Sequence, residues 1–337
     1  MKKRLLKPPR HDREVLCIPG AHTLKQAARG GRVVGTCHQP YFFNPGVSVR
    51  FLLTEMLPAH NKALLFMDTD RVKLKAGIPR PDGKPGTLTL VNTGRALYNY
   101  QLPERGRIER FFSEVEAEVR EHLPGQAESI LAQVGRYKKI FLQNSTATLL
   151  KQALADSFMQ FYGIKGSYRF LSQVLNTEPY REFLWKIYEN DHRFRSVYNQ
   201  ALDDYKKNFR FRYKNFPFPK LTEGELPFWV VKNGERNPLF KQTISSEELK
   251  DCLCFPKASP LTAFLRLYHT DMFIHGVGGG NYEWVNDRII EDFFKNSPPP
   301  YFVVSATFHI HPSGERSYPY FFLDPEVPRN SAASLLD

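Results

Sequence analysis

The chain has 337 residues, of which 42% are hydrophobic and 14% aromatic, so it is long enough for two domains or one large elaborated domain. No apolar run approaches the ~20 residues of a membrane helix, and the basic start lacks the apolar core of a signal peptide, so we expect a cytoplasmic protein without membrane contact. A total of 47 Lys and Arg against 35 Asp and Glu gives a net charge of +12, which favours anionic partners.

Residues 1–32 are rich in Lys and Arg and show no clean hydrophobic period, so we expect a basic N-terminal arm. The four cysteines are too few for a disulfide framework in a chain of this length. Cys252 and Cys254 are spaced too tightly for the usual zinc pair. All four cysteines, which include Cys17 and Cys37, are therefore expected to be free thiols.

The first strand is expected at residue 33. The apolar run Val33–Cys37 predicts a buried strand, Val47–Leu57 carries apolar residues at helical spacing, and Ala63–Met67 is a second apolar run. Strand, helix and strand in this order predict a parallel crossover unit. The fold class expected from this unit is α/β, with a Rossmann-like parallel sheet as its core.

Polar residues follow both of these strands. His38, Gln39 and Asn44 lie in the loop after the first, and Asp68 and Asp70 come after the second. Open α/β sheets bind ligands at the carboxyl ends of their strands. The two aspartates are spaced i, i+2, so they share a face if the strand persists. We expect a catalytic role for His38 and both aspartates, and substrate binding by Gln39 and Asn44; turn-forming and capping roles are the alternative.

A helical segment is expected next. Arg71 to Arg95 is rich in Gly, Pro and charge, which favours an excursion loop with one strand at Thr87–Val91. Residues 106–209 then show mostly helical periods and are expected to form an insertion. The helices expected there are Arg107–His122, Ala127–Val134, Thr146–Tyr162, Pro179–Tyr188 and His192–Phe209.

Phe209–Lys214 alternates aromatic and basic residues. This pattern is open to three interpretations: stacking and charge on single-stranded nucleic acid, an edge strand with one buried face, or a basic wall of an anion site. Leu226–Val231 restores strand character, and Ser245–Glu248 fits a capping box. Strands thus resume after the insertion, so the core is expected to be discontinuous, with segments 33–105 and 210–322.

A glycine cluster follows the apolar segment Met272–His275 and precedes an expected helix, Glu283–Phe294. This arrangement fits an anion cradle, because backbone N–H groups and the helix dipole favour negative charge. Tight turns and close packing are the other common use of glycine. The candidate binding residues here are His275, Gly276, Gly278, Gly279, Gly280 and Tyr282.

Tyr301–Phe308 predicts a further buried strand that leads to His309 and His311. The two histidines share a strand face, but no third and fourth ligand can be identified, so no metal site is predicted. Residues 323–337 form a polar tail.

The Cys37–Gly46 loop, the Phe66–Asp70 strand end and the Asp271–Gly279 segment together resemble an uncharacterised bacterial family, as do Tyr198–Leu202 and Leu226–Trp229. That family is similar to the bacillithiol-biosynthesis cysteine-adding enzymes. The resemblance implies a Rossmann-like core with helical insertions, a bound nucleotide, and the condensation of cysteine with a glucosaminyl malate. The Gly-Gln-Gln of those enzymes aligns with Cys37-His38-Gln39, so Gln39 is retained.

These features together predict an enzyme of the ligase or transferase kind that acts on a phosphorylated or nucleotide-activated small molecule, in amino-sugar or thiol-conjugate metabolism. The cofactor is unknown; a nucleotide, with or without Mg²⁺, fits the pattern. Two alternatives stay open: a non-catalytic module that binds nucleotide or RNA, and a metal-dependent hydrolase using His38, Asp68, Asp70 and His275. The sequence also leaves open a homo-oligomer.

Overall fold

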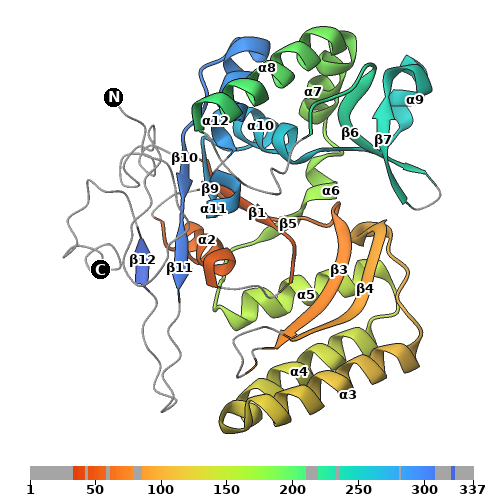
Figure 1. Cartoon of the computed structure of the whole chain (residues 1–337), viewed down its shortest axis with the longest axis vertical. Coiled ribbons are helices and arrows are strands. Elements are labelled where there is room, and N and C mark those ends of the chain that lie inside the picture. Colours follow the sequence, from red (N-terminus) through yellow and green to blue (C-terminus); the bar gives the residue numbers. More distant parts are fainter. Residues whose placement is uncertain are drawn as a thin grey trace.

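A computed structural model describes most of the chain (Figure 1). The described residues are 33–41, 45–57, 61–78, 80, 86–209, 219–232, 235–280, 282–307 and 320–322. Several sequence predictions lie outside them: the basic arm, Asn44, residues 210–214 of the aromatic and basic segment, both histidines at 309 and 311, and the tail.

A parallel sheet of five strands forms the centre of the fold. Its strands are β1 (Val33–His38), β2 (Asn61–Phe66), β5 (Tyr168–Phe170), β9 (Met272–His275) and β10 (Tyr301–Val303), in the spatial order β10-β9-β1-β2-β5. Every pair is parallel. The chain builds outward from β1 through β2 to β5, then returns to the other side of β1 for β9 and β10. The order therefore reverses between β1 and β9.

Helices cover both faces of this sheet. On one face, α2 (Pro45–Met56) and α5 (Ala147–Phe161) pack Phe51 and Phe158 against Phe66 of β2. On the other face, Leu65 and Phe273 belong to the large hydrophobic cluster. That cluster also includes residues of α7 (Glu178–Glu189), α8 (Asp191–Phe209), α10 (Ala258–Tyr268), α12 (Glu283–Ile289) and the π-helical turn η4 (Ile290–Phe294). Burial on both faces explains why the buried parts of β1 and β2 show no alternation of apolar and charged residues. The strand–helix–strand prediction is confirmed.

A second sheet is antiparallel, in the order β3-β4-β7-β6-β8. Its strands are β3 (Arg71–Ile78), β4 (Gly86–Ala96), β6 (Glu225–Lys232), β7 (Glu235–Phe240) and β8 (Cys254–Pro256). The strand expected at Thr87–Val91 is confirmed as part of β4, but the excursion loop expected around it is wrong, since β3 and β4 form a hairpin. Strands after residue 210 were expected to extend the parallel core, but β6 to β8 join this second sheet, and only β9 and β10 join the first.

Segment 106–209 is helical as expected, with one exception. The helices are α3 (Arg105–His122), α4 (Ala127–Gln143), which is longer than predicted, α5, the short α6 (Leu171–Val174), α7 and α8. The exception is β5, which pairs with β2 at the edge of the parallel sheet. Figure 1 shows α3 and α4 side by side as an antiparallel pair beside the β3–β4 hairpin. The segment therefore contributes a strand, and α5 as a covering helix, to the core.

Short elements complete the fold. They are η1 (Leu97–Asn99), η2 (Pro124–Gln126), η3 (Lys241–Thr243), α9 (Ser246–Asp251), α11 (Val277–Gly280) and the pair β11 (Ser305–Thr307) and β12 (Tyr320–Phe322). The predicted capping box opens α9, with Ser245 and Glu248 bonding each other's backbone N–H groups. Among the helices within the described ranges, none combines the length and the hydrophobicity required to cross a bilayer.

Gly35 in β1 gives a test of how closely this sheet packs. A Cβ there would lie 2.4 Å from Cγ2 of Thr270, whose hydroxyl is bonded to the Leu265 carbonyl oxygen. We predict that Gly35→Ala lowers the free energy of unfolding by about 2 kcal/mol, because overpacking a filled core forces its neighbours apart. Denaturant unfolding is the measurement, and Gly77→Ala in β3, with no atom within 4 Å of the added methyl, is the control. Equal stabilities of the two variants would contradict the packing described here.

Candidate functional site

The candidate site lies at the carboxyl ends of β1 and β9, where the strand order reverses. β1 ends at His38, and β9 ends at His275, which Gly276 follows. The side chain of Arg50 reaches this place from α2: its Nε lies 3.6 Å from the position that a Cβ on Gly276 would occupy. Electrostatic interactions link Arg50 to His38, Cys37 and Tyr282. A cation, Arg50, thus lies among the polar residues that were predicted to form the site.

Arg50 is buried, with only 6% of its surface exposed. Its Nε donates a long hydrogen bond of 3.3 Å to the carbonyl oxygen of Val47, one turn back in α2. Within the described residues, no carboxylate lies at ion-pair distance from its guanidinium. Burial lowers the pKa of Arg50 to about 10. A buried cation without a counter-ion is costly, and an anionic ligand would remove that cost.

Sequence reasoning missed Arg50, although a signal was present. The residue lies between Val49 and Phe51 in a helix whose apolar positions include both neighbours and face the sheet. An arginine inside an apolar stripe must either extend its charge to the surface or be buried with it. Here the charge is buried. Whether it is buried or reaches the surface depends on the tertiary packing of α2, which the sequence does not reveal.

His38 is mostly buried beside this cation. Burial, and secondly the charge of Arg50, lower its pKa to about 3, against a smaller opposing effect of a hydrogen bond with the Gln39 backbone. The imidazole is therefore neutral at pH 7 and, without a ligand, a weak base. The neighbouring Cys37 is a protonated thiol, because burial raises its pKa to about 12.

Asp68 and Asp70 do not share a face, because β2 already ends at Phe66. Asp68 is fully buried and accepts hydrogen bonds from Lys151 Nζ at 2.5 Å, from the Ser172 hydroxyl at 2.6 Å and from the Ser172 backbone N–H at 2.9 Å. It thereby holds α5 and α6 against the end of β2. With its oxygens engaged in this way, Asp68 acts as a structural anchor.

Asp70 joins the two sheets instead. It accepts hydrogen bonds from Gln39 Nε2 at 2.6 Å and from Arg236 Nη1 of β7 at 2.8 Å. The Arg236 guanidinium also lies 5.0 Å from the centroid of the Trp229 ring, and Lys257 Nζ lies 4.9 Å from the same centroid. The amide of Gln39, expected to orient substrate, is thus engaged in fixing the loop after β1.

His275 is buried behind the sheet edge. Its Nε2 lies 2.9 Å from Oε1 of Glu283, which in turn pairs with the buried Arg266. Burial lowers the pKa of His275, and Glu283 opposes this effect. A carboxylate in this position repels phosphate, so we do not retain His275 as a phosphate ligand.

The glycine cluster forms the single turn α11. Gly280 N–H donates to the Gly276 carbonyl oxygen at 2.9 Å, and Tyr282 N–H donates to that of Gly279. A Cβ on Gly279 would lie 2.3 Å from Nδ1 of His275, so this glycine is required for close packing. Gly278 is exposed. Tyr282 packs beside His275, and burial raises the pKa of its phenol. Gly276 and Tyr282 lie near Arg50, and the charge of Arg50 also acts on His275.

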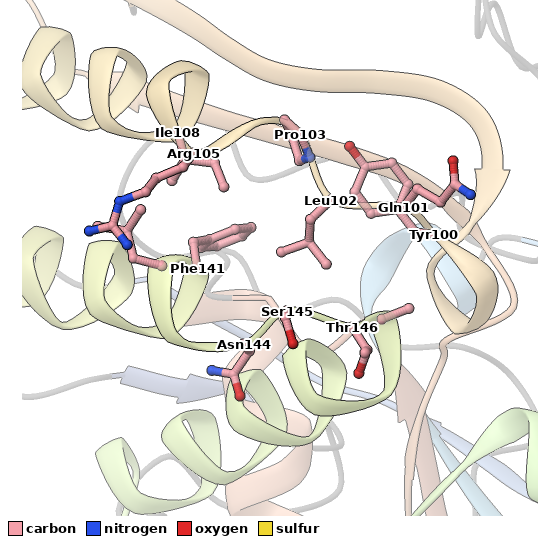
Figure 2. A pocket seen from close by; sticks show the side chains of 12 residues that line it. Tyr100, Gln101, Leu102, Pro103, Arg105, Ile108, Phe141, Asn144, Ser145 and Thr146 are labelled. Carbon is pink, nitrogen blue, oxygen red and sulfur yellow. The ribbon is translucent and has the colours of Figure 1, made fainter.

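In the described part of the chain, no three His, Cys, Asp or Glu side chains lie close enough together to hold a metal ion. A cavity of about 510 Å³ lies between α3, α4 and the start of α5. Figure 2 shows Tyr100–Pro103 on one side of it and Asn144–Thr146 on another. A second, of about 720 Å³, is lined by α7 and α9.

No family model matches the chain, and no curated protein is similar enough to count as a relative.

The role of Asp68 can be tested by an isosteric change. We predict that Asp68→Asn lowers the free energy of unfolding by about 3 kcal/mol, because it leaves the Lys151 charge buried without its partner. The measurement is denaturant unfolding. Asp203→Asn breaks the exposed pair with Lys220 and serves as the control, with an expected loss under about 1 kcal/mol. Unchanged stability of Asp68→Asn would instead point to a catalytic carboxylate.

The lowered pKa of His38 should make the stability of the protein depend on pH. Its folded-state pKa of about 3 lies below the unfolded value near 6.5, so acid protonates the unfolded chain first and stability falls as pH drops from 6.5 towards 3. In this window the His38 ring should lower the free energy of unfolding of the wild type by up to ~1.4 kcal/mol for each pH unit of acidification. We predict that this contribution is missing in His38→Gln, so its stability falls less steeply. The measurement is denaturant unfolding at a series of pH values. Parallel curves for the two proteins would show that His38 is not buried as a neutral ring.

Proposed function

We propose that the protein is an enzyme of the ligase or transferase kind that acts on a phosphorylated or nucleotide-activated small molecule. The ligand binds at the carboxyl edge between β1 and β9. One observation carries the proposal: the buried guanidinium of Arg50, which has no carboxylate partner among the described residues, lies beside the neutral imidazole of His38. An anion-binding group and a proton acceptor at one sheet edge are what such transfer chemistry needs.

The strand order supports this place. Numbered along the chain, the parallel strands run 5-4-1-2-3, which read from the other side is the 3-2-1-4-5 order of doubly wound, Rossmann-like sheets. In such sheets, ligands bind outside the carboxyl ends of the strands at the point where the order reverses. His38, Arg50 and Gly276 all lie at this point. The net charge of +12 would also draw an anionic substrate towards the protein.

Each group has a distinct role in the proposed reaction. Arg50 binds the phosphate through charge-assisted hydrogen bonds, and the absence of a side chain on Gly276 lets the ligand approach the backbone. His38 acts as a general base that accepts a proton from the attacking group. A bound anion offsets the field of Arg50, which raises the pKa of His38 and makes it a better base once substrate is present. Asp68, Asp70 and Gln39 hold the edge in shape.

The finer substrate class follows from the sequence resemblance. Similarity to the cysteine-adding enzymes favours a ligase reaction in amino-sugar or thiol-conjugate metabolism, with a nucleotide as activated substrate or cofactor. The retained Gln39 belongs to that resemblance, and its bond to Asp70 gives it a positioning role.

Arg50→Met separates binding from folding. Because burial costs the charged guanidinium about 3 kcal/mol, a methionine of similar length should leave the unliganded protein as stable or up to about 3 kcal/mol more stable. The same variant should lose the rise in melting temperature that nucleotides or sugar phosphates produce in the wild type. A thermal-shift screen with these compounds measures both effects.

Two further variants complete the design. Arg120→Met removes an exposed cation from α3 and should keep the ligand-induced shift. His38→Gln should bind the active compound within a few-fold of wild type but lose turnover. Retained turnover would refute His38 as the general base, whereas binding without any turnover in the wild type would favour a non-catalytic binding module. A ligand-induced shift that survives in Arg50→Met would refute the proposed site.

A further inference from the structure

Two cysteines line the cavity between α7 and α9. Its volume is about 720 Å³, and the side chains that form its walls include Tyr180, Arg181, Trp185, Lys250, Cys252 and Cys254. Arg181 is held by Glu178 and Asn176, and the Lys250 ammonium lies 5.9 Å from the centroid of the Trp185 ring. The walls thus combine aromatic surface with charges of both signs. None of these residues belongs to the site at the edge of the parallel sheet.

The local backbone brings the two thiols together. Cys252 follows α9 directly and has an extended conformation (φ −88°, ψ 128°), and Cys254 begins β8. Side chains two residues apart in an extended chain point to the same side. The Cys254 thiol accordingly donates a hydrogen bond to the Cys252 sulfur. Cys252 is half-buried at the cavity wall, whereas Cys254 is 1% exposed.

Cys254 is held firmly in its position. It pairs with Val230 in the antiparallel sheet, and its carbonyl oxygen accepts a hydrogen bond of 2.7 Å from the Tyr180 hydroxyl. The donor thiol is therefore fixed by β8 and α7 before any ligand arrives. Such preorganisation makes it an effective partner for a charged sulfur, since no reordering is needed.

The surroundings make the two cysteines chemically different. The hydrogen bond from Cys254 lowers the pKa of Cys252 to about 7; burial opposes this, Lys232 of β6 assists it and Glu248 of α9 weakens it. The same hydrogen bond and burial raise the pKa of Cys254. Of the two cysteines, Cys252 therefore loses its proton more readily, and Cys254 stays a thiol. The thiolate is the nucleophilic form of cysteine.

We propose that Cys252 is a reactive thiol that forms a mixed disulfide with a low-molecular-weight disulfide bound in the cavity between α7 and α9, with Cys254 as a positioning hydrogen-bond donor. The Cys252 sulfur attacks one sulfur of the ligand, the ligand's S–S bond breaks, and a new S–S bond joins Cys252 to half of it. The other half leaves as a thiolate and takes a proton from water. The ligand is the oxidant, and no other co-reactant is required.

The test uses the full-length chain carrying Cys17→Ser, since Cys17 lies outside the described residues. Incubation with oxidised glutathione at pH 7, followed by intact-mass and peptide mass spectrometry, should show one adduct on Cys252 and none on the buried Cys37. An internal Cys252–Cys254 disulfide formed from that adduct would support the same attack. No loss of the Cys252 thiol, or equal modification of Cys37, would overturn the proposal.

A second measurement tests the role of Cys254 without glutathione. The rate of alkylation of Cys252 by iodoacetamide should follow a pKa near 7 in the Cys17→Ser protein. In a Cys254→Ala variant the pKa should rise, and the rate at pH 7 should fall about tenfold, because the hydrogen bond to the thiolate is gone. Cys252→Ser abolishes the modification and identifies the reacting residue. A pH profile unchanged by Cys254→Ala would refute the positioning role.

Discussion

The arrangement of the parallel sheet depends on a buried carboxylate at the end of β2. Asp68 is fully buried, and it accepts hydrogen bonds from Lys151 of α5 and from both the hydroxyl and the backbone N–H of Ser172 in α6. Its own carbonyl oxygen accepts the N–H of Tyr98, which follows the β3–β4 hairpin. One residue thus fixes a covering helix, the helical turn after the edge strand and the segment that follows the β3–β4 hairpin. A buried ion pair of this kind fixes position more than it adds stability.

Some of this architecture could be predicted from the sequence because the signals are local. The apolar runs of β1 and β2 and the helical period of α2 are each visible in a short window. β3 was missed because its alternation of Val72 and Leu74 with lysines resembles a charged loop, and β5 because three residues carry no period at all. The orientation of Asp68 depends on Lys151, 83 positions away, so no local pattern could reveal it.

In the candidate site, too, some features could be predicted from the sequence and others depend on distant contacts. The position of His38 in the fold could be predicted, since the carboxyl ends of parallel strands meet at one edge of a sheet, and β1 does end at His38. The roles were not predictable, because they depend on which polar groups find partners. Both aspartates and Gln39 are engaged in structural bonds, whereas Arg50, an arginine between apolar residues of α2, is left without a counter-ion among the described residues.

The bond network of Asp70 has a mechanical consequence. Gln39, in the loop after β1, and Arg236, in β7, hold opposite sides of the same carboxylate, so the loop of one sheet and a strand of the other share a single attachment point. A displacement of the loop after β1 would therefore strain the attachment of β7 as well. The two sheets are coupled at Asp70, although their strands do not pair with each other.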